Sequence, residues 1–112
     1  MKRIGIISDT HSLWDDRYAK YFSNCDEIWH AGDIGDESII DRLEKVAPVV
    51  RAVYGNCDGG NMRRRFKPME IFTTDGVKVM LTHIGGYPGK YAPGIRSRLD
   101  LSAPQLFVDG HS

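Results

Sequence analysis

Short apolar runs alternate with amphipathic segments along the first half of the chain. Three runs rich in β-branched residues end in polar turns and predict buried strands of the parallel type, at residues 4–7, 27–31 and 49–54. Between these runs, apolar residues spaced three to four positions apart predict helices over residues 13–22 and 36–46. Asp36 is the expected N-cap of the second helix, and Pro48 stops it. This β-α-β-α-β order predicts an α/β fold with right-handed crossovers.

The second half of the chain predicts antiparallel structure. Residues 70–74 and 77–82 are expected to be strands, and the Asp75-Gly76 pair between them suits the type I′ turn of a β-hairpin. The remaining segments are predicted to be loops over residues 61–68 and 85–94, a short helix over 95–101 and a last strand over 105–109.

Composition limits the class of protein. The 112 residues fit one domain, residues 1–112, which buries roughly two thirds of the surface that its unfolded chain exposes. Equal counts of 15 basic and 15 acidic side chains argue against a general nucleic-acid binder or a protein that binds acidic membranes, since both need an excess of positive charge. Cys25 and Cys57 do not form a CxxC motif, and no apolar stretch is long enough to span a membrane. We therefore expect a soluble cytoplasmic protein with reduced thiols.

Six side chains that can bind metal ions follow the predicted strands. They are Asp9, His11, Asp33, Asn56, His83 and His111. The carboxyl ends of parallel strands share one edge of a sheet, so we expect these side chains to converge there. Carboxylate, imidazole and amide donors suit two divalent ions, with Asp33 as the expected bridge between them. Two such ions can clamp a phosphoryl group and generate hydroxide at neutral pH, which predicts phosphoester hydrolysis without a covalent protein nucleophile.

The order of these motifs resembles that of a known family. Asp9-x-His11, Gly32-Asp33, Gly55-Asn56-Cys57-Asp58, His83 and Gly110-His111 are similar to the motif series of the calcineurin-like metallophosphoesterases, specifically their small prokaryotic phosphodiesterases. The resemblance implies a four-layer α/β/β/α sandwich that hydrolyses small phosphodiesters with a hydroxide bridging two metal ions. Manganese is the expected ion, and iron, zinc and nickel are alternatives.

The resemblance also assigns residues to the two ions. One ion would be bound by Asp9, His11 and Asp33, and the other by Asp33, Asn56, His83 and His111. The expected catalytic residues are Asp33, Asn56 and His83.

Two features depart from the family pattern. Larger members carry a histidine where this chain has Cys57, and a thiol with its usual pKa is a poor general acid for an alkoxide. We therefore expect activity mainly on diesters with good leaving groups, and we expect Asp58 to orient its loop. The family motif Gly-His-x-His is cut after Gly110-His111-Ser112, so C-terminal strands are expected to be missing, and a homo-oligomer or a completing chain is expected to stabilise the protein.

Several other residues have competing interpretations. His30 lies inside a predicted strand and is expected to be a hydrogen-bonded core histidine that supports the site. Arg63, Arg64 and Arg65 form a dense basic run, which is either a solvated loop face or the source of one arginine that pairs with a substrate phosphate. Cys57 is not expected to be a nucleophile, because no histidine adjoins it in the sequence.

Two other functions remain open from the sequence. A scaffold similar to a retromer subunit would share the fold, bind protein partners and hydrolyse little or nothing. Such scaffolds lose ligand side chains, whereas all six predicted ligands are present here. A nucleotide-binding α/β module is disfavoured, because the loop after the first strand lacks a glycine-rich phosphate-binding motif.

Overall fold

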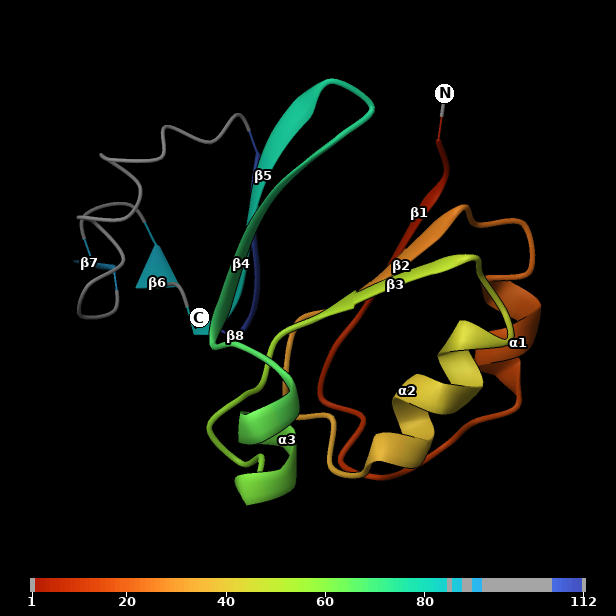
Figure 1. Cartoon of the computed structure of the whole chain (residues 1–112), viewed down its shortest axis with the longest axis horizontal. Helices are drawn as coiled ribbons and strands as arrows, with labels where there is room; N and C mark the ends of the chain where they lie inside the picture. The colour runs from red at the N-terminus through yellow and green to blue at the C-terminus, as the bar shows by residue number, and fades with distance from the viewer. Residues whose placement is uncertain (1, 85, 88–89, 92–105, 112) are drawn as a thin grey trace.

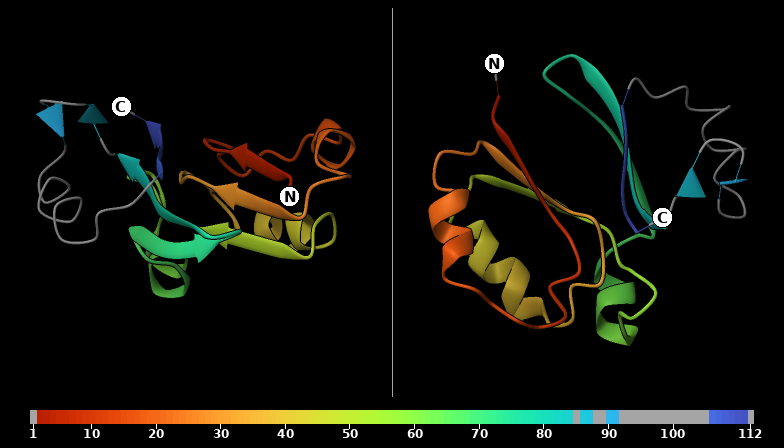
Figure 2. Two further views of the ribbon diagram at one scale, coloured as in Figure 1. Left: turned by 90° about the horizontal axis from the view of Figure 1, so that it is seen from above. Right: turned by 180° about the vertical axis from the view of Figure 1, so that it is seen from behind.

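The computed structural model describes residues 2–84, 86–87, 90–91 and 106–111. These residues include a layer of helices and two three-stranded sheets that pack face to face (Figures 1 and 2), together with a separate two-stranded sheet. They therefore supply the α, β and β layers of the predicted four-layer sandwich. None of the helices in this part of the chain has both the length and the apolar character needed to cross a membrane.

The first sheet consists of the parallel strands that the sequence predicts. Strands β1 (Ile4–Ile7), β2 (Glu27–His30) and β3 (Val49–Ala52) lie in the order β1-β2-β3. Helices α1 (Arg17–Tyr21) and α2 (Glu37–Glu44) connect these strands and cover one face of the sheet (Figure 1). The carboxyl ends of the strands consequently face the same way, as the predicted site requires.

The two helices differ in how closely they follow the prediction. In α2 the predicted cap is confirmed, because the Asp36 carboxylate accepts a hydrogen bond from the amide of Ser38. Helix α1 is shorter than the predicted span of residues 13–22. Residues 13–16 lie outside the helix, and the amide of Arg17, its first residue, donates to the Asp15 carboxylate at 2.9 Å.

The second sheet contains the predicted hairpin and the last predicted strand. Strands β4 (Met69–Thr74), β5 (Val77–Ile84) and β8 (Leu106–His111) lie in the order β4-β5-β8, with β4 antiparallel and β8 parallel to β5. The type I′ turn is confirmed by positive φ values of 50° at Asp75 and 78° at Gly76. Strand β8 continues to His111, beyond the predicted end at residue 109.

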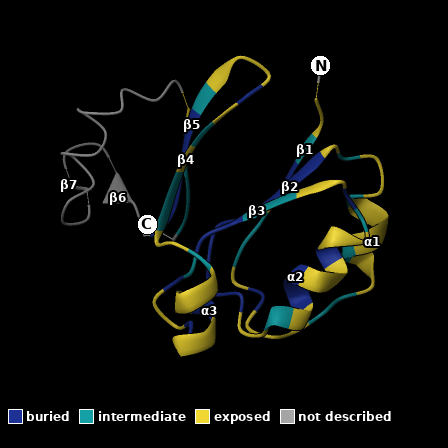
Figure 3. Ribbon diagram, in the orientation of Figure 1, coloured by how far each residue is buried: buried dark blue, intermediate teal, exposed yellow. Residues whose placement is uncertain are grey.

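An apolar core joins the two sheets. Trp29 and Val53 from the first sheet's side pack with Val79 and Leu81 of β5, and all four are almost fully buried. The Trp29 ring meets the Phe72 ring edge-on, with 5.1 Å between ring centroids. Figure 3 shows the buried residues along the facing strands. This core fixes how the loops at the carboxyl ends of both sheets lie relative to one another.

A buried carboxylate strengthens the contact between the sheets. Glu27, which is 1% exposed, accepts hydrogen bonds from Trp29 Nε1 at 3.0 Å, Arg51 Nε at 2.8 Å, Lys2 Nζ at 3.0 Å and the Thr74 hydroxyl. Burial by itself would raise the pKa of this carboxyl, but the hydrogen bonds from Thr74, Arg51, Trp29 and Lys2 outweigh it and lower the pKa to about 2. Glu27 is therefore ionised at neutral pH and links β2 and β3 to the hairpin.

Two predicted loops contain regular structure. Residues 61–68 were expected to be a loop, but helix α3 (Gly60–Arg65) occupies most of the segment, with Met62 buried in the core. The glycine pair at the start of α3 hides its helical pattern. In the predicted loop over 85–94, strands β6 (Gly86–Tyr87) and β7 (Lys90–Tyr91) pair antiparallel. The helix predicted over residues 95–101 lies outside the described residues.

Candidate metal centre

The loops after β1 and β2 are held together through their backbones. The amide of Asp9 donates to the carbonyl of Gly32 at 2.9 Å, and the amide of His11 donates to the carbonyl of Asp33 at 3.0 Å. These bonds continue the pairing of β1 with β2 beyond the sheet. As a result, the side chains of Asp9 and His11 are held beside that of Asp33.

The backbone of this region is strained at the predicted ligands. Asp9, His11 and Asp33 have φ values of 57°, 47° and 56°, in the left-handed region that residues other than glycine seldom adopt. Gly32 has a φ of 100°, and a Cβ there would lie 2.6 Å from the His83 side chain. Strain of this kind persists only where the surrounding structure enforces it, and it is concentrated at functional sites. The strained positions thus coincide with the predicted metal site.

Asp33 lies at the centre of the cluster. Its Oδ2 atom is 3.2 Å from His83 Nε2 and 3.9 Å from His11 Nε2, and its side chain is 5% exposed. The donor atoms of Asp9, Asp33 and His83 lie within 4.8 Å of one another, and so do those of His11, Asp33 and Cys57. Asp33 belongs to both groups, which is the position that a bridging ligand requires.

The tautomer of His83 fits a cation at this position. Its Nδ1 atom lies 2.6 Å from the carbonyl oxygen of Ala31, which can only accept, so Nδ1 carries a proton. In the neutral ring, the lone pair of Nε2 then faces the carboxylates of Asp33, at 3.2 Å, and Asp9, at 4.0 Å. Lone pairs that face one another in this way repel each other, and a cation bound between them would replace this repulsion with attraction. The donor set therefore suits a divalent ion, with its histidine oriented by a backbone carbonyl.

Two predicted ligands are less closely defined. Asn56 follows β3 on an exposed loop, where its Nδ2 atom lies 3.6 Å from Cys57 Sγ. His111 ends β8, and its backbone pairs with Ile84 at the end of β5, next to His83. The side chain of His111 lies outside the described part of the structure. Metal binding by Asn56 and His111 remains a prediction.

Asp58 fastens the loop after β3 to the loop after β2. Its Oδ2 accepts from the amides of Gly55 at 2.8 Å and Ile34 at 3.2 Å, and its Oδ1 accepts from the amide of Gly35 at 2.8 Å. The carboxylate is almost fully buried by these loops. The prediction that Asp58 orients its loop is confirmed.

His30 supports the same loops from inside the sheet. The amide of Gly32 donates to His30 Nδ1 at 3.1 Å, so the other nitrogen, Nε2, carries the proton and donates to the Thr10 hydroxyl at 3.0 Å. Thr10 in turn donates to the carbonyl of Ile34 at 2.8 Å. Burial lowers the pKa of His30 to about 4, and the charges of the nearby acidic groups oppose this shift only in part. The predicted role as a hydrogen-bonded core histidine is confirmed.

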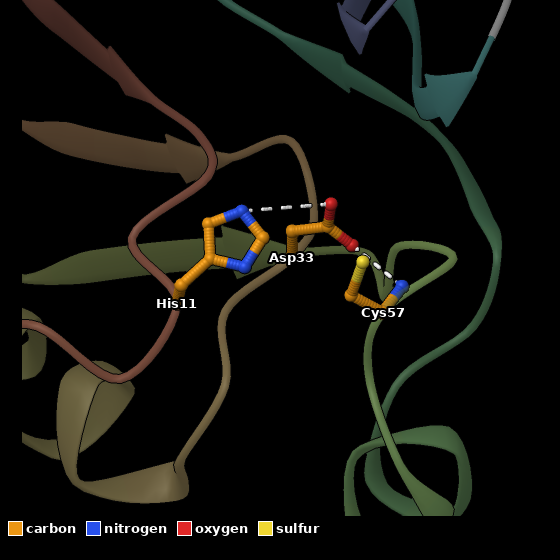
Figure 4. Close-up of side chains that lie close together, drawn as sticks. All are labelled: His11, Asp33 and Cys57. Carbon is orange, nitrogen blue, oxygen red and sulfur yellow. Dashed lines mark hydrogen bonds and ion pairs between the residues drawn. The ribbon is translucent and has the colours of Figure 1, made fainter.

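Cys57 faces the cluster from the loop after β3. Its amide donates to Asp33 Oδ1 at 2.8 Å, and its side chain is exposed beside His11 and Asp33 (Figure 4). The negative charge of Asp33 is the main cause that raises the pKa of the Cys57 thiol above its ordinary value. In the absence of a cation the thiol therefore stays protonated at neutral pH, which agrees with the expectation that it is not a nucleophile.

Arg63 has a role that the sequence did not indicate. Its Nε donates to the carbonyl of Asp58 at 2.8 Å, and its Nη2 donates to the carbonyl of Asn56 at 3.4 Å. The guanidinium also lies over the Tyr54 ring, 4.7 Å from its centroid. Arg63 thus holds the backbone on both sides of Cys57. Only knowledge of α3 would have shown which way this side chain points.

The other two arginines of the run make different contacts. The guanidinium of Arg65 lies 3.4 to 3.6 Å from carboxylates along α2, those of Glu37, Asp41 and Glu44. Arg64 instead lines a hollow of about 320 Å³ between the starts of α2 and α3. Its other lining residues are Gly35, Asp36, Glu37, Gly59, Gly60, Asn61 and Met62.

Known proteins share both the sequence pattern and the fold. A family model described as a calcineurin-like phosphoesterase superfamily domain matches residues 1–112. A probable metallophosphoesterase of Methanocaldococcus jannaschii is 38% identical over 112 residues, which covers 95% of this chain and 54% of that protein. The solved structure of an archaeal phosphodiesterase matches with a TM-score of 0.69 and 23% identity, over 96% of this chain and 70% of that one. The solved structure of Vps29 from Chaetomium thermophilum matches with a TM-score of 0.71 and 15% identity, over 96% of this chain and 60% of that one.

These likenesses carry different weight. The two solved structures are too distant in sequence to show more than the fold, which they share along nearly the whole of this chain. The chain spans about half the length of the Methanocaldococcus protein. The family model, however, matches all 112 residues, and this range contains every predicted ligand. The chain therefore belongs to the calcineurin-like phosphoesterase superfamily.

Proposed function

We propose that this chain forms the metal centre of a phosphodiesterase with two divalent ions. The observation that carries the proposal is the position of Asp33, which shares one group of donor atoms with Asp9 and His83 and another with His11 and Cys57. Membership of the superfamily and the likeness to an archaeal phosphodiesterase support it. Asn56 and His111 are proposed to complete the ligand set, and manganese is the proposed ion.

The chemistry follows from what the donors can hold. Bound divalent ions would supply a water of lowered pKa and would neutralise charge on the phosphoryl group. The protein's part is to hold the Asp33 carboxylate between the two donor groups and to keep His83 Nε2 directed at it, through the Nδ1 contact with Ala31 at 2.6 Å. Asp58 and His30 hold the loops that carry these residues.

Two observations bear on the substrate. A thiol is a poor proton donor to an alkoxide, so Cys57 does not assist a poor leaving group and the proposed substrates are small diesters whose leaving groups are stable anions. Arg63 and Arg65 bind groups of other segments, whereas Arg64 donates to the Asn61 side chain within its own helix and borders the hollow beside the loops of the site. We therefore propose Arg64, of the three arginines, as the one that contacts a substrate phosphate.

A second candidate function is a protein-binding scaffold. It is favoured by the likeness to Vps29, which has a TM-score of 0.71. The clustering of Asp9, His11, Asp33 and His83 argues for the enzyme, because a scaffold does not need strained backbone at these positions. The enzyme would need the cluster of Asp9, His11, Asp33 and His83 for hydrolysis, whereas the scaffold would bind protein partners without it.

Hydrolysis of bis-p-nitrophenyl phosphate separates these candidates. We expect hydrolysis with Mn²⁺ that is lost on chelation and falls at least a hundredfold in Asp33→Asn, since the bridging charge is removed (about 100-fold corresponds to about 2.7 kcal/mol). Asp41→Asn is the matched control, because Asp41 is exposed on α2 and makes an ion pair with Arg65 outside the site. If the unaltered chain with Mn²⁺ is no faster than Asp33→Asn, the enzyme proposal is wrong and the scaffold is favoured.

A further inference from the structure

We propose that Cys57 binds a metal ion as a thiolate, together with His11 and Asp33. This inference rests on the proposed metal centre, but it adds a ligand at one of the two metal positions and favours zinc over manganese there. The family resemblance implies Asp9, His11 and Asp33 for one ion. The structure groups His11 with Asp33 and Cys57, and it also places Asp9 Oδ1 3.7 Å from His11 Nε2, so Cys57 is added to the ligands that the resemblance implies.

The three donors come from three separate loops and meet at one point. His11 follows β1, Asp33 follows β2 and Cys57 follows β3, so the parallel order of the first sheet brings them together. In Figure 4, His11 and Cys57 lie on opposite sides of the Asp33 carboxylate, and the sulfur of Cys57 points toward it. Their donor atoms lie within 4.8 Å of one another.

These separations suit a single ion after small side-chain rotations. Zinc binds sulfur at about 2.3 Å and nitrogen or carboxylate oxygen at about 2.0–2.2 Å, so two donors of one tetrahedral ion lie about 3.4–3.6 Å apart. The hydrogen bond from the Cys57 amide to Asp33 Oδ1, at 2.8 Å, already fixes the Cys57 backbone against Asp33. The side chains of His11, which is 54% exposed, and Cys57 are not enclosed by packing, which leaves room for such rotations.

The chemistry of this donor set differs from that of an all-nitrogen-and-oxygen site. On binding, the bond between Sγ and hydrogen breaks, the bond between Sγ and the metal forms, and the proton leaves to solvent. One imidazole, one carboxylate and one thiolate occupy three positions of a tetrahedral ion, and the fourth is left for the nearby Asp9 carboxylate or for a water. Thiolate is a soft ligand and favours zinc or cobalt over manganese. The structure thus assigns zinc-like ions to this position.

Cobalt spectroscopy tests the inference directly. We expect the chain titrated with Co²⁺ to develop the near-ultraviolet charge-transfer band of a cobalt–thiolate bond, and we expect Cys57→Ser to lose this band. Cys25→Ser is the matched control, because Cys25 is the other thiol and packs against the core beneath the helices. In Cys57→Ser, zinc affinity should fall by about tenfold or more, the scale on which changes around metal ligands act, and manganese affinity should fall less.

The possible outcomes separate this inference from the proposed function. Cobalt bands without the charge-transfer band, or a band that persists in Cys57→Ser, would overturn the thiolate ligand even if Mn²⁺-dependent hydrolysis is found. A charge-transfer band that depends on Cys57, in a chain that does not hydrolyse diesters, would support the ligand and contradict the phosphodiesterase. If the unaltered chain binds no cobalt, both are wrong. Serine replaces an exposed thiol with a group of similar size, and circular dichroism checks that the variant is folded.

Discussion

Asp58 is the residue whose alteration tests the construction of the site most sharply. The substitution Asp58→Asn preserves size and shape but replaces one acceptor oxygen with a donor NH₂ group. In the structure, three amides point at this carboxylate, those of Ile34, Gly35 and Gly55, at distances of 2.8 to 3.2 Å. An asparagine can place its oxygen toward Ile34 and Gly55, but its NH₂ group must then face the amide of Gly35.

The expected cost follows from these contacts. Hydrogen bonds to a charged acceptor each contribute about 1.5–3 kcal/mol, and a buried donor without an acceptor costs about 1–3 kcal/mol. Asp58→Asn removes the negative charge from two bonds and leaves the Gly35 amide facing another donor in a site that is 4% exposed. We expect the free energy of unfolding to fall by about 2–4 kcal/mol.

Urea denaturation in the presence of a chelator measures this effect without any contribution from bound metal. Asp36→Asn is the matched control, because Asp36 caps α2 by accepting from the Ser38 amide and asparagine is an equally good N-cap. We expect less than about 0.5 kcal/mol for the control. If Asp58→Asn is no more destabilising than Asp36→Asn, the view that Asp58 ties the two loops together is wrong.

Three further predictions test other contacts of the structure. Arg63→Lys should weaken metal binding in a calorimetric titration, because a single ammonium group cannot donate to the carbonyls of both Asn56 and Asp58 as the guanidinium does. An unchanged metal affinity would contradict this role of Arg63. In the metal-free chain, His30 should account for a loss of about 3 kcal/mol of stability as the pH falls from 6.5 to 4, because over this range the unfolded state takes up a proton on His30 and the folded state, with a pKa of about 4, largely does not. His30→Gln should make the pH dependence less steep, and an equally steep profile in the variant would count against this role. Glu27→Gln should lower the free energy of unfolding by about 3 kcal/mol, because it removes the negative charge that accepts the hydrogen bonds from Lys2 and Arg51. A loss below about 1 kcal/mol in a urea titration would contradict the role given to Glu27.

The sequence predicts those parts of the fold that are decided locally. The strands at residues 4–7 and 77–82 and the turn at Asp75-Gly76 follow from short-range patterns, and the structure contains each of them. Helix α3 was missed because its N-cap and its first residue are glycines and its apolar contacts, through Met62, are made with distant parts of the chain.

The candidate site shows the same division. Convergence of Asp9, His11 and Asp33 could be predicted, since parallel strands deliver their following loops to one edge of the sheet. The pairing of Cys57 with His11 and Asp33 could not, because it depends on left-handed backbone angles and on side-chain directions that sequence spacing does not report. The hydrogen bond from Arg63 to the carbonyl of Asn56 likewise depends on helix α3, which the sequence did not predict.

The central claim is that Asp33 lies between two metal ions. A crystal of the chain grown with Mn²⁺ or Zn²⁺, with anomalous scattering recorded at the absorption edge of the metal, tests it most directly. We expect two anomalous peaks about 3.5–4 Å apart, one on each side of the Asp33 carboxylate. A single peak, or no peak while His83 and Asp33 remain in direct contact, would contradict the account.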